Sequence, residues 1–258
     1  MRESVKVSLI LTTFNCIENL KRTLKSIEMQ DYPKIEVVIA DGKSTDGTVE
    51  LIRKYENQSK YEVKWVSEKD QGIYDAMNKG YRMSTGEVIA FFNDLFLSDH
   101  AVKWMVEAIE TGNCEGAHAD LIYATDEKVI RYWKMGKGDI RQGWMPGHPT
   151  LYLRREVYEK YGLYDTSYRC SADYEFMVRI LKNNEVKLAY VPVTILRMYY
   201  GGTSTSGMGS YWLSVKEGHR ALLSNGIRNA WLIDFRRTLK VCIQFLKAGK
   251  YKGKRNDD

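Results

Sequence analysis

Polar residues stand where the apolar segments of this sequence end. Asp41 follows the β-branched run 35–40, and Asn93 and Asp94 follow the apolar run 87–92. If these runs are strands of a parallel sheet, their carboxyl ends lie at the edge where such sheets bind ligands. Carboxylate and amide oxygens suit a hard divalent ion, Mg²⁺ or Mn²⁺, that also holds phosphate. An ordinary turn or loop aspartate is the alternative for each acid taken singly.

Further candidate groups stand at the starts of two expected helices. Asp173 opens an apolar-faced helix, where a carboxylate interacts favourably with the helix dipole. Such a group is ionised at neutral pH and could also act as a general base. The polar segment 67–80 leads from a strand into another helix. Lys69, Asp75 and Asn78 could therefore face the same edge of the sheet, or they could belong to a solvated helix start.

The loop 143–150 holds His148 between Pro146 and Pro149. This stiff setting predicts an exposed histidine with either a structural or a substrate-contacting role. The sequence contains neither GxGxxG nor GxxxxGK[ST], which disfavours a dinucleotide-binding fold and a P-loop enzyme. A bound phosphate would therefore need a metal ion rather than a glycine-rich loop.

Strand-like and helix-like segments alternate through the first half of the chain. Short apolar runs indicate strands buried on both faces, and residues at helical spacing, such as Leu20, Leu24 and Ile27, indicate helices between them. This alternation predicts an α/β fold with a mostly parallel central sheet flanked by helices. The expected strands are 5–13, 35–40, 62–66 and 87–92, and the expected helices are 19–30, 73–83 and one capped by residues 44–46.

The second half of the chain is less regular. Its expected elements are a hairpin of 117–124 and 128–133, helices at 155–161, 172–182 and 211–224, and a strand at 188–198. No internal repeat or low-complexity linker interrupts the sequence. We therefore expect one domain over 1–225, with a nucleotide-binding half 1–100 and an acceptor half 101–225, followed by a basic amphipathic tail at 226–258.

Several of these segments together resemble the motifs of family 2 glycosyltransferases with the GT-A fold. The resemblance covers residues 5–205, with the motifs in the expected order and at the expected spacing. Within that family the sequence resembles bacterial enzymes that build O-antigen, capsule or exopolysaccharide repeat units. The segments that carry it are SLILTTFN (8–15), EVVIADGKSTDGT (36–48), the polar segment 67–80, the loop 143–150, ADYE (172–175), and Arg197-Met198 followed by Gly201-Gly202.

The resemblance implies an inverting glycosyltransferase that moves a sugar from a nucleotide-sugar, a UDP-sugar, to a saccharide acceptor linked to polyprenyl diphosphate. Asp173 would be the catalytic base, and Asp94 would hold Mn²⁺ or Mg²⁺ on the donor diphosphate. Trp144, His148 and Arg197 would contact the acceptor or the leaving group. The residues implied to bind the nucleotide-sugar are Thr12, Phe14, Asn15, Asp41, Lys69, Gly72, Asp75, Asn78 and Asn93.

One motif departs from the pattern of the family. Relatives usually have Asn-x-Asp-Asp or Asn-x-Gly-Asp after this strand, whereas Asn93 and Asp94 lead directly into Leu95 and Phe96. Asp94 alone could hold the metal ion with phosphate and water, or the ion could bind weakly. The third alternative is a homologue that binds a nucleotide-sugar with little or no transferase activity.

The net charge of +6 comes entirely from the end of the chain, because residues 236–258 hold eight Lys and Arg against two Asp. The remainder is neutral, so no nucleic-acid partner is expected. On a helical wheel, Phe235, Leu239 and Leu246 form an apolar stripe beside a basic face. This pattern predicts a helix that lies on an anionic membrane surface, or one that docks on the body with a solvated basic end.

The composition excludes other classes of protein. The hydrophobic content of 44% is ordinary, and Gly and Pro are not repeated, which excludes a disordered or collagen-like chain. No apolar run approaches the roughly 20 residues that span a bilayer, and no signal peptide is recognised. Four dispersed cysteines predict reduced thiols. We therefore expect a cytoplasmic protein that is peripheral on the inner face of the cell membrane.

Overall fold

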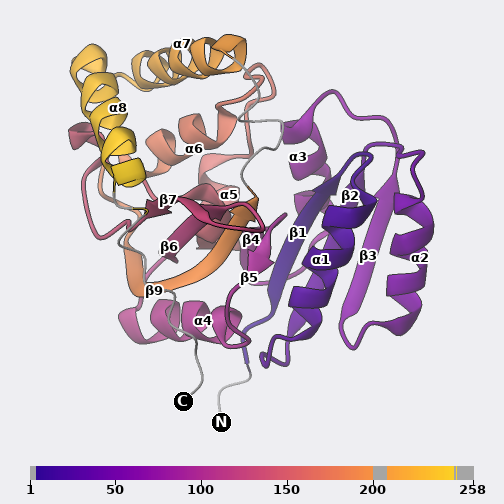
Figure 1. Cartoon of the computed structure of the whole chain (residues 1–258). Helices are drawn as coiled ribbons and strands as arrows, with labels where there is room; N and C mark the ends of the chain where they lie inside the picture. The colour runs from indigo at the N-terminus through magenta and orange to yellow at the C-terminus, as the bar shows by residue number, and fades with distance from the viewer. Residues whose placement is uncertain (1–3, 200–207, 247, 249–258) are drawn as a thin grey trace.

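The computed structural model describes residues 4–199, 208–246 and 248, and over that part of the chain nine strands form one sheet with helices on both faces (Figure 1). The strand order is β3-β2-β1-β4-β8-β6-β9-β5, with β7 paired to β6 outside this path. The strands are β1 (Val7–Thr13), β2 (Ile35–Asp41), β3 (Glu62–Ser67), β4 (Val88–Phe91), β5 (Leu95–Phe96), β6 (Gly116–Ala124), β7 (Val129–Trp133), β8 (Tyr152–Arg154) and β9 (Leu188–Tyr199). The helices are α1 (Ile17–Glu28), α2 (Thr48–Gln58), α3 (Ile73–Met83), α4 (Ala101–Gly112), α5 (Arg155–Tyr161), α6 (Ala172–Leu181), α7 (Met208–Ser224) and α8 (Ala230–Leu246). The predicted α/β fold class is confirmed.

Strands β3, β2, β1 and β4 are parallel and form the N-terminal half of the sheet. All seven residues of β2 are buried, because helices cover both of its faces. Side chains alternate between the two layers: Leu9 and Leu11 lie in the core with α1, α2 and α4, whereas Ile10 lies in the core with α3, α5 and α6. The register places Thr13 beside Asp41 and Asp41 beside Ser67, so the carboxyl ends of three strands meet at one edge.

The second half of the sheet is mixed rather than parallel. Strand β8 is antiparallel to both β4 and β6, while β6 and β9 run parallel. The hairpin of β6 and β7 is confirmed. Helix α4 and the short strands β5 and β8 are not among the predicted elements, although apolar residues at helical spacing mark α4, namely Val102, Met105, Val106 and Ile109.

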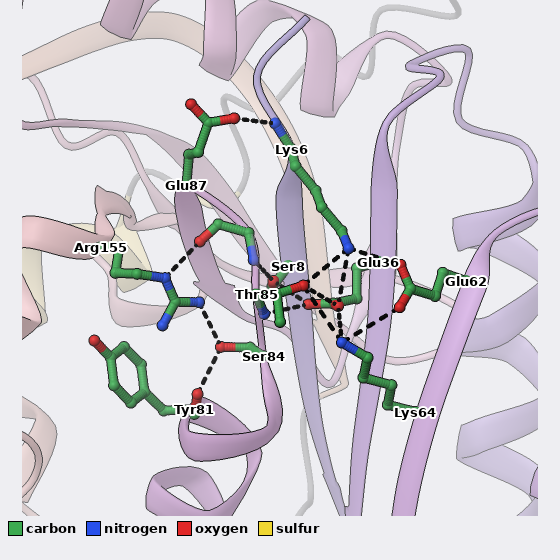
Figure 2. A network of polar contacts seen from close by, with 11 residues as sticks. Lys6, Ser8, Glu36, Glu62, Lys64, Tyr81, Ser84, Thr85, Glu87 and Arg155 are labelled. Atoms are coloured by element: carbon green, nitrogen blue, oxygen red, sulfur yellow. Dashed lines mark hydrogen bonds and ion pairs between the residues drawn. The ribbon is translucent and has the colours of Figure 1, made fainter.

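A buried carboxylate, Glu36, ties the sheet together at the end opposite the strand-end residues (Figure 2). Its oxygens accept hydrogen bonds from Ser8 Oγ (2.5 Å), Lys64 Nζ (2.7 Å), Thr85 N (2.8 Å) and Thr85 Oγ1 (2.7 Å). Lys6 Nζ lies 3.1 Å from Glu36 Oε1. Three strands and the loop between α3 and β4 are therefore joined through one side chain.

Helix α8 is the amphipathic helix expected near the C-terminus, and its inner face docks on the body. Ala230 and Ile233 are buried in the core that contains residues of α5 and α6. Gly143 is closely covered, since a Cβ there would lie 2.9 Å from Arg237 N. The division of the chain at residues 100 and 225 stays a prediction.

The outer face of α8 carries large apolar side chains in contact with solvent. Phe235 is 65% exposed and Leu239 is 53% exposed, and Trp231 and Leu246 are also exposed. Lys247 and the basic run from Lys250 lie outside the described residues. In the described part of the chain, no helix has both the length and the apolar character needed to cross a bilayer.

Candidate active site

Asp41, at the end of β2, organises the edge where the strands meet. Its carboxylate is 1% exposed and accepts four hydrogen bonds, from Thr13 Oγ1 (2.8 Å), Ser44 N (2.9 Å), Ser44 Oγ (2.6 Å) and Ser67 Oγ (2.6 Å). Burial opposes ionisation, but the hydrogen bonds from Ser44, Ser67 and Thr13 outweigh it and lower the pKa of Asp41. Asp41 is therefore ionised, and a nucleotide contact to it would replace one of these internal donors.

The loop after β1 presents Phe14 and Asn15 at this edge. Asn15 adopts a left-handed backbone conformation (φ 46°), and its Oδ1 accepts a hydrogen bond from Thr45 N (2.9 Å). The Phe14 ring is 67% exposed. Gly42 lies close beneath it, because a Cβ there would come within 3.2 Å of the Phe14 ring and 2.9 Å of Asp70 Oδ2. An exposed aromatic ring therefore lies at this edge of the sheet.

Asn93 and Thr12 hold the ends of β4 and β1 together. Thr12 N donates to Asn93 Oδ1 (2.9 Å), and Asn93 Nδ2 donates to Thr12 Oγ1 (2.9 Å). Strand β5 begins at Leu95, so the shortened motif leaves Asp94 as the only residue between this pair and the next strand.

Asp94 is a half-buried carboxylate without a hydrogen-bond or ion-pair partner among the described residues. Burial alone raises its pKa to about 7. Such an uncompensated carboxylate fits a cation site. No group of three His, Cys, Asp or Glu in the described residues could hold a metal ion unaided, so Asp94 would share the ion with phosphate oxygens and water.

Asp173, in the first turn of α6, faces α3 beside the core that contains Ile10. Tyr74 donates its hydroxyl hydrogen to Asp173 Oδ1 (2.9 Å). Burial first, and then the negative charge of Asp173, raises the pKa of Tyr74 well above its ordinary value, so Tyr74 remains a donor at neutral pH. The contact holds the carboxylate in one orientation while Oδ2 has no hydrogen-bond partner among the described residues.

Tyr123 on β6 lies within electrostatic range of both Asp94 and Asp173, and no sequence pattern singled it out. Burial raises the pKa of Tyr123, the Arg131 guanidinium opposes the change, and the charges of Asp94 and Asp173 add to it. Both carboxylates therefore lie within electrostatic range of one phenol. The Arg131 guanidinium lies over its ring, 4.6 Å from the centroid.

The expectation of an exposed His148 is wrong. The ring is half-buried, stacks on Phe91 (centroids 5.8 Å apart, 26° between planes) and lies 2.8 Å from Tyr164 Oη through Nε2. The aromatic residues around it exclude solvent. Burial lowers the pKa of His148, although the charge of Asp173 opposes this, so the imidazole is neutral at pH 7.

The segment 67–80 is organised around Lys79, which sequence reasoning did not single out. Its ammonium lies 2.7 Å from Asp70, 3.0 Å from Glu68 and 3.5 Å from Asp75. Lys69 is exposed and its carbonyl accepts a hydrogen bond from the same ammonium (3.1 Å). The carbonyl of Lys69 and the carboxylate of Asp75 therefore both lie close to the Lys79 ammonium.

Gly72 and Asn78 determine the start and the anchoring of α3 in this segment. Gly72 caps α3 with a φ of 131°, a conformation that favours glycine. Asn78 is buried, and its side chain is fully engaged with the backbone of Tyr164, as donor to the carbonyl (2.9 Å) and acceptor from the amide (3.1 Å). Asn78 thereby positions the residue that contacts His148.

A cavity of about 690 Å³ opens beside Asp173. Trp144 lines it and is held by a hydrogen bond from Nε1 to the carbonyl of Met135 (3.0 Å). Residues of β7, α7 and α8 complete the wall. Asp173 and Trp144 therefore share a space large enough for a small-molecule substrate.

Arg197 lies outside this cavity. Its guanidinium donates to the carbonyl of Thr125 (2.7 Å) and pairs with Asp126 (3.1 Å), which holds the turn between β6 and β7. In the register of β5 and β9, Arg197 is opposite Leu95, next to Asp94. Gly201 and Gly202, the end of the same predicted motif, lie outside the described residues.

Comparison with known proteins agrees with this architecture. An uncharacterized glycosyltransferase of Mycobacterium tuberculosis is 30% identical over 224 residues, which cover 82% of this chain and 79% of that protein. An uncharacterized glycosyltransferase of Nostoc sp. is 31% identical over 170 residues, or 60% of this chain, and the match spans 53% of that protein's length.

Solved structures show the same fold at low sequence identity. S. aureus TarS in complex with UDP-GlcNAc has a TM-score of 0.70 at 18% identity, covering 91% of this chain and 72% of that one. The mannosyltransferase PcManGT from Pyrobaculum calidifontis, in complex with GDP-Man and Mn²⁺, has a TM-score of 0.66 at 18% identity, covering 97% and 77%. Residues 8–172 match the family described as Glycosyl transferase family 2. The resemblance read from the sequence is confirmed for the family and the GT-A fold: this chain belongs to glycosyltransferase family 2.

Proposed function

We propose that this chain transfers a sugar from a nucleotide-sugar to a saccharide acceptor, with inversion at the anomeric carbon. The observation that carries the proposal is the position of Asp173, which lines an open cavity and is oriented by Tyr74. The charges of Asp173 and Asp94 both raise the pKa of Tyr123, so the two carboxylates belong to one site. The complexes of TarS with UDP-GlcNAc and of PcManGT with GDP-Man support a nucleotide-sugar donor. A UDP-sugar is the donor we propose.

Asp173 is the catalytic base in this mechanism. Its Oδ2 takes the proton of an acceptor hydroxyl, whose oxygen attacks the anomeric carbon from the face opposite the nucleotide. The bond from that carbon to the diphosphate breaks, and its electron pair leaves with the nucleoside diphosphate. Tyr74 stays hydrogen-bonded to Oδ1, so it keeps Oδ2 directed at the acceptor.

Asp94 is the residue that holds Mn²⁺ or Mg²⁺. Its unpaired carboxylate supports this role, as does the Mn²⁺ bound by PcManGT. When bound, the ion stabilises negative charge that develops on the departing diphosphate. Because Asp94 must be ionised to bind a cation, its raised pKa makes metal affinity depend on pH near neutrality.

The strand-end loops bind the nucleotide-sugar. Thr12, Phe14, Asn15 and Asn93 border the nucleotide, and Asp41 bonds the uracil or its ribose in exchange for an internal donor. Lys69, Gly72 and Asp75 lie near the base and the donor sugar. Asn78 acts through its hold on Tyr164 rather than by direct contact, because both of its polar atoms are engaged.

The acceptor is a saccharide linked to polyprenyl diphosphate, in the synthesis of O-antigen, capsule or exopolysaccharide. Trp144 lines the cavity where the acceptor would lie. His148 acts through its contact with Tyr164, and Arg197 supports the β6–β7 turn while its strand position is opposite Leu95, next to Asp94.

The outer face of α8 meets an anionic membrane surface, so that the protein is peripheral on the inner face of the cell membrane. The exposed Phe235 and Leu239 and the basic residues that follow support this placement. Deleting the chain after Ser224 would also remove a wall of the cavity. Point substitutions on the outer face are therefore the informative variants.

A nucleotide-sugar-binding homologue without transferase activity is the second candidate. The observation that favours it is the direct passage from Asp94 into β5, which leaves this motif shorter than the pattern usual for the family. In that case the nucleotide-sugar binds but no diphosphate is released.

The test is the release of UDP from a panel of UDP-sugars, with Mn²⁺ and with chelator. We expect release from at least one donor and a fall in release with chelator. Asp99→Asn is the matched control for site variants, since Asp99 is exposed and its carboxylate has no hydrogen-bond partner among the described residues. Binding of UDP-sugars without any release, across the panel and with added polyprenyl-linked acceptors, would overturn the transferase proposal in favour of the second candidate.

A further inference from the structure

The cavity beside Asp173 has one strongly basic wall. Lys134 and Lys137 lie just beyond β7, and Lys240 comes from α8; all three line the cavity. None of the three ammonium groups has a hydrogen-bond or ion-pair partner among the described residues. Among the residues that the structure describes, Asp173 is the only acidic one in the lining. The cavity thus carries an excess of positive charge within a space that is largely apolar.

A fourth cation, Arg237, has a different position in the same wall. Its guanidinium lies over the Tyr174 ring, 4.2 Å from the centroid, and 3.7 Å from Asp234. These contacts fix Arg237 and partly neutralise it. None of the three lysines is held in this way, although Lys134 lies within electrostatic range of the buried Asp120. Burial, followed by the charge of Arg236, lowers the pKa of Lys240. An anion bound beside Lys240 would relieve its repulsion from Arg236.

The basic wall is separate from the edge that would hold the donor diphosphate. Thr12, Asp41 and Asp94 do not line this cavity, whereas Asp173 does. A molecule in the cavity can therefore reach Asp173 without contacting these three strand-end residues. Aromatic residues, among them Trp133 and Trp144, line the same space.

We propose that Lys134, Lys137 and Lys240 bind a phosphate or diphosphate group of the acceptor, so that this cavity selects anionic acceptors. The inference rests on the proposed transferase function and adds the group by which the acceptor is recognised. A lipid-linked diphosphate and a soluble phosphorylated saccharide share this chemistry. Helix α8 is then part of the acceptor site on its inner face while its outer face stays available for a membrane.

The test is a binding measurement, so it does not depend on turnover. Isothermal titration calorimetry with chelator present uses geranyl diphosphate, inorganic diphosphate and geraniol as probes. The variant is Lys134→Ala/Lys137→Ala/Lys240→Ala. The matched control removes the same charge from exposed, unpaired lysines of α1, α2 and α4, as Lys25→Ala/Lys54→Ala/Lys103→Ala. The single variant Lys240→Gln serves if the triple variant does not fold.

We expect the triple variant to bind geranyl diphosphate about tenfold or more weakly than the wild type, while the control stays within about twofold. Tighter binding of geranyl diphosphate than of inorganic diphosphate would identify a lipid-linked source, and equal binding a soluble one. Equal affinity of wild type and triple variant, or of geraniol and geranyl diphosphate, would overturn the inference. Release of UDP by the wild type tests the proposed function by itself, without these probes or variants, so a failure of this inference is distinct from a failure of the proposed function.

Discussion

Replacing Glu36 by Gln should remove a measurable part of the pH dependence of folding. Burial disfavours the charged form, but hydrogen bonds from Lys64, Ser8 and Thr85 outweigh it and lower the pKa of Glu36 from 4.5 to about 2. Because the folded-state pKa lies below the unfolded one, the stabilisation is present above pH 4.5 and is lost as the pH falls towards 2. This difference corresponds to about 3 kcal/mol at pH 7, of which about 2 kcal/mol is lost by pH 3.

Urea unfolding followed by circular dichroism at pH 7 and pH 3 measures this effect. The wild type should lose about 2 kcal/mol more free energy of unfolding between these two pH values than Glu36→Gln. Glu62→Gln is the matched control, because Glu62 pairs with the same Lys6 and Lys64 but its side chain is half exposed. Its pH dependence should stay close to that of the wild type. Equal pH dependence in Glu36→Gln and the wild type would refute the reasoning.

Three further outcomes follow from the site. Tyr74→Phe should lower kcat about tenfold with little change in the donor KM, because the variant loses only the hydrogen bond that orients Asp173; a wild-type kcat would remove that role. Asp94→Ala should abolish stimulation by Mn²⁺, and in the wild type that stimulation should rise as the pH rises through about 7, where the carboxyl group ionises; a flat pH profile would contradict the assignment. Phe235→Ser/Leu239→Ser should weaken sedimentation with anionic liposomes without loss of secondary structure, whereas unchanged binding would exclude this face as a membrane contact.

The first half of the fold was predicted well from the sequence, because each strand there is marked by a short apolar run of neighbouring residues. β2 is apolar, buried along its whole length and followed directly by a turn, so the position of Asp41 at the strand end was predictable. α3 matches its predicted bounds. α4 carries the same kind of apolar spacing and could have been found by it.

The contacts that complete the site come from pairs that are distant in the chain. Tyr74 and Asp173 are 99 residues apart, and Asn78 and Tyr164 are 86 apart. Nothing local in the sequence marks such a pair, since it depends on how α3 packs against α6 and the loop that precedes it. The exposure of His148 was misjudged for the same reason: its prolines are local, but Phe91 and Tyr164 arrive from other elements.

The basic wall shows why net charge alone was a coarse guide. The sequence located the excess charge at the C-terminal end, and a helical wheel of that segment separated an apolar face from a basic one. Only the packing of α8 against β7 and the loop at Gly143 turns Lys240 towards the same cavity as Asp173.

The central claim, that Asp173 is the base of a sugar transfer, is tested most directly by Asp173→Asn. The measurement is the rate of UDP release from the preferred UDP-sugar, together with UDP affinity by calorimetry, for this variant, Asp99→Asn and the wild type. Loss of most turnover in Asp173→Asn, with UDP affinity nearly unchanged and Asp99→Asn fully active, is the predicted result. Equal turnover in Asp173→Asn and the wild type would contradict the account.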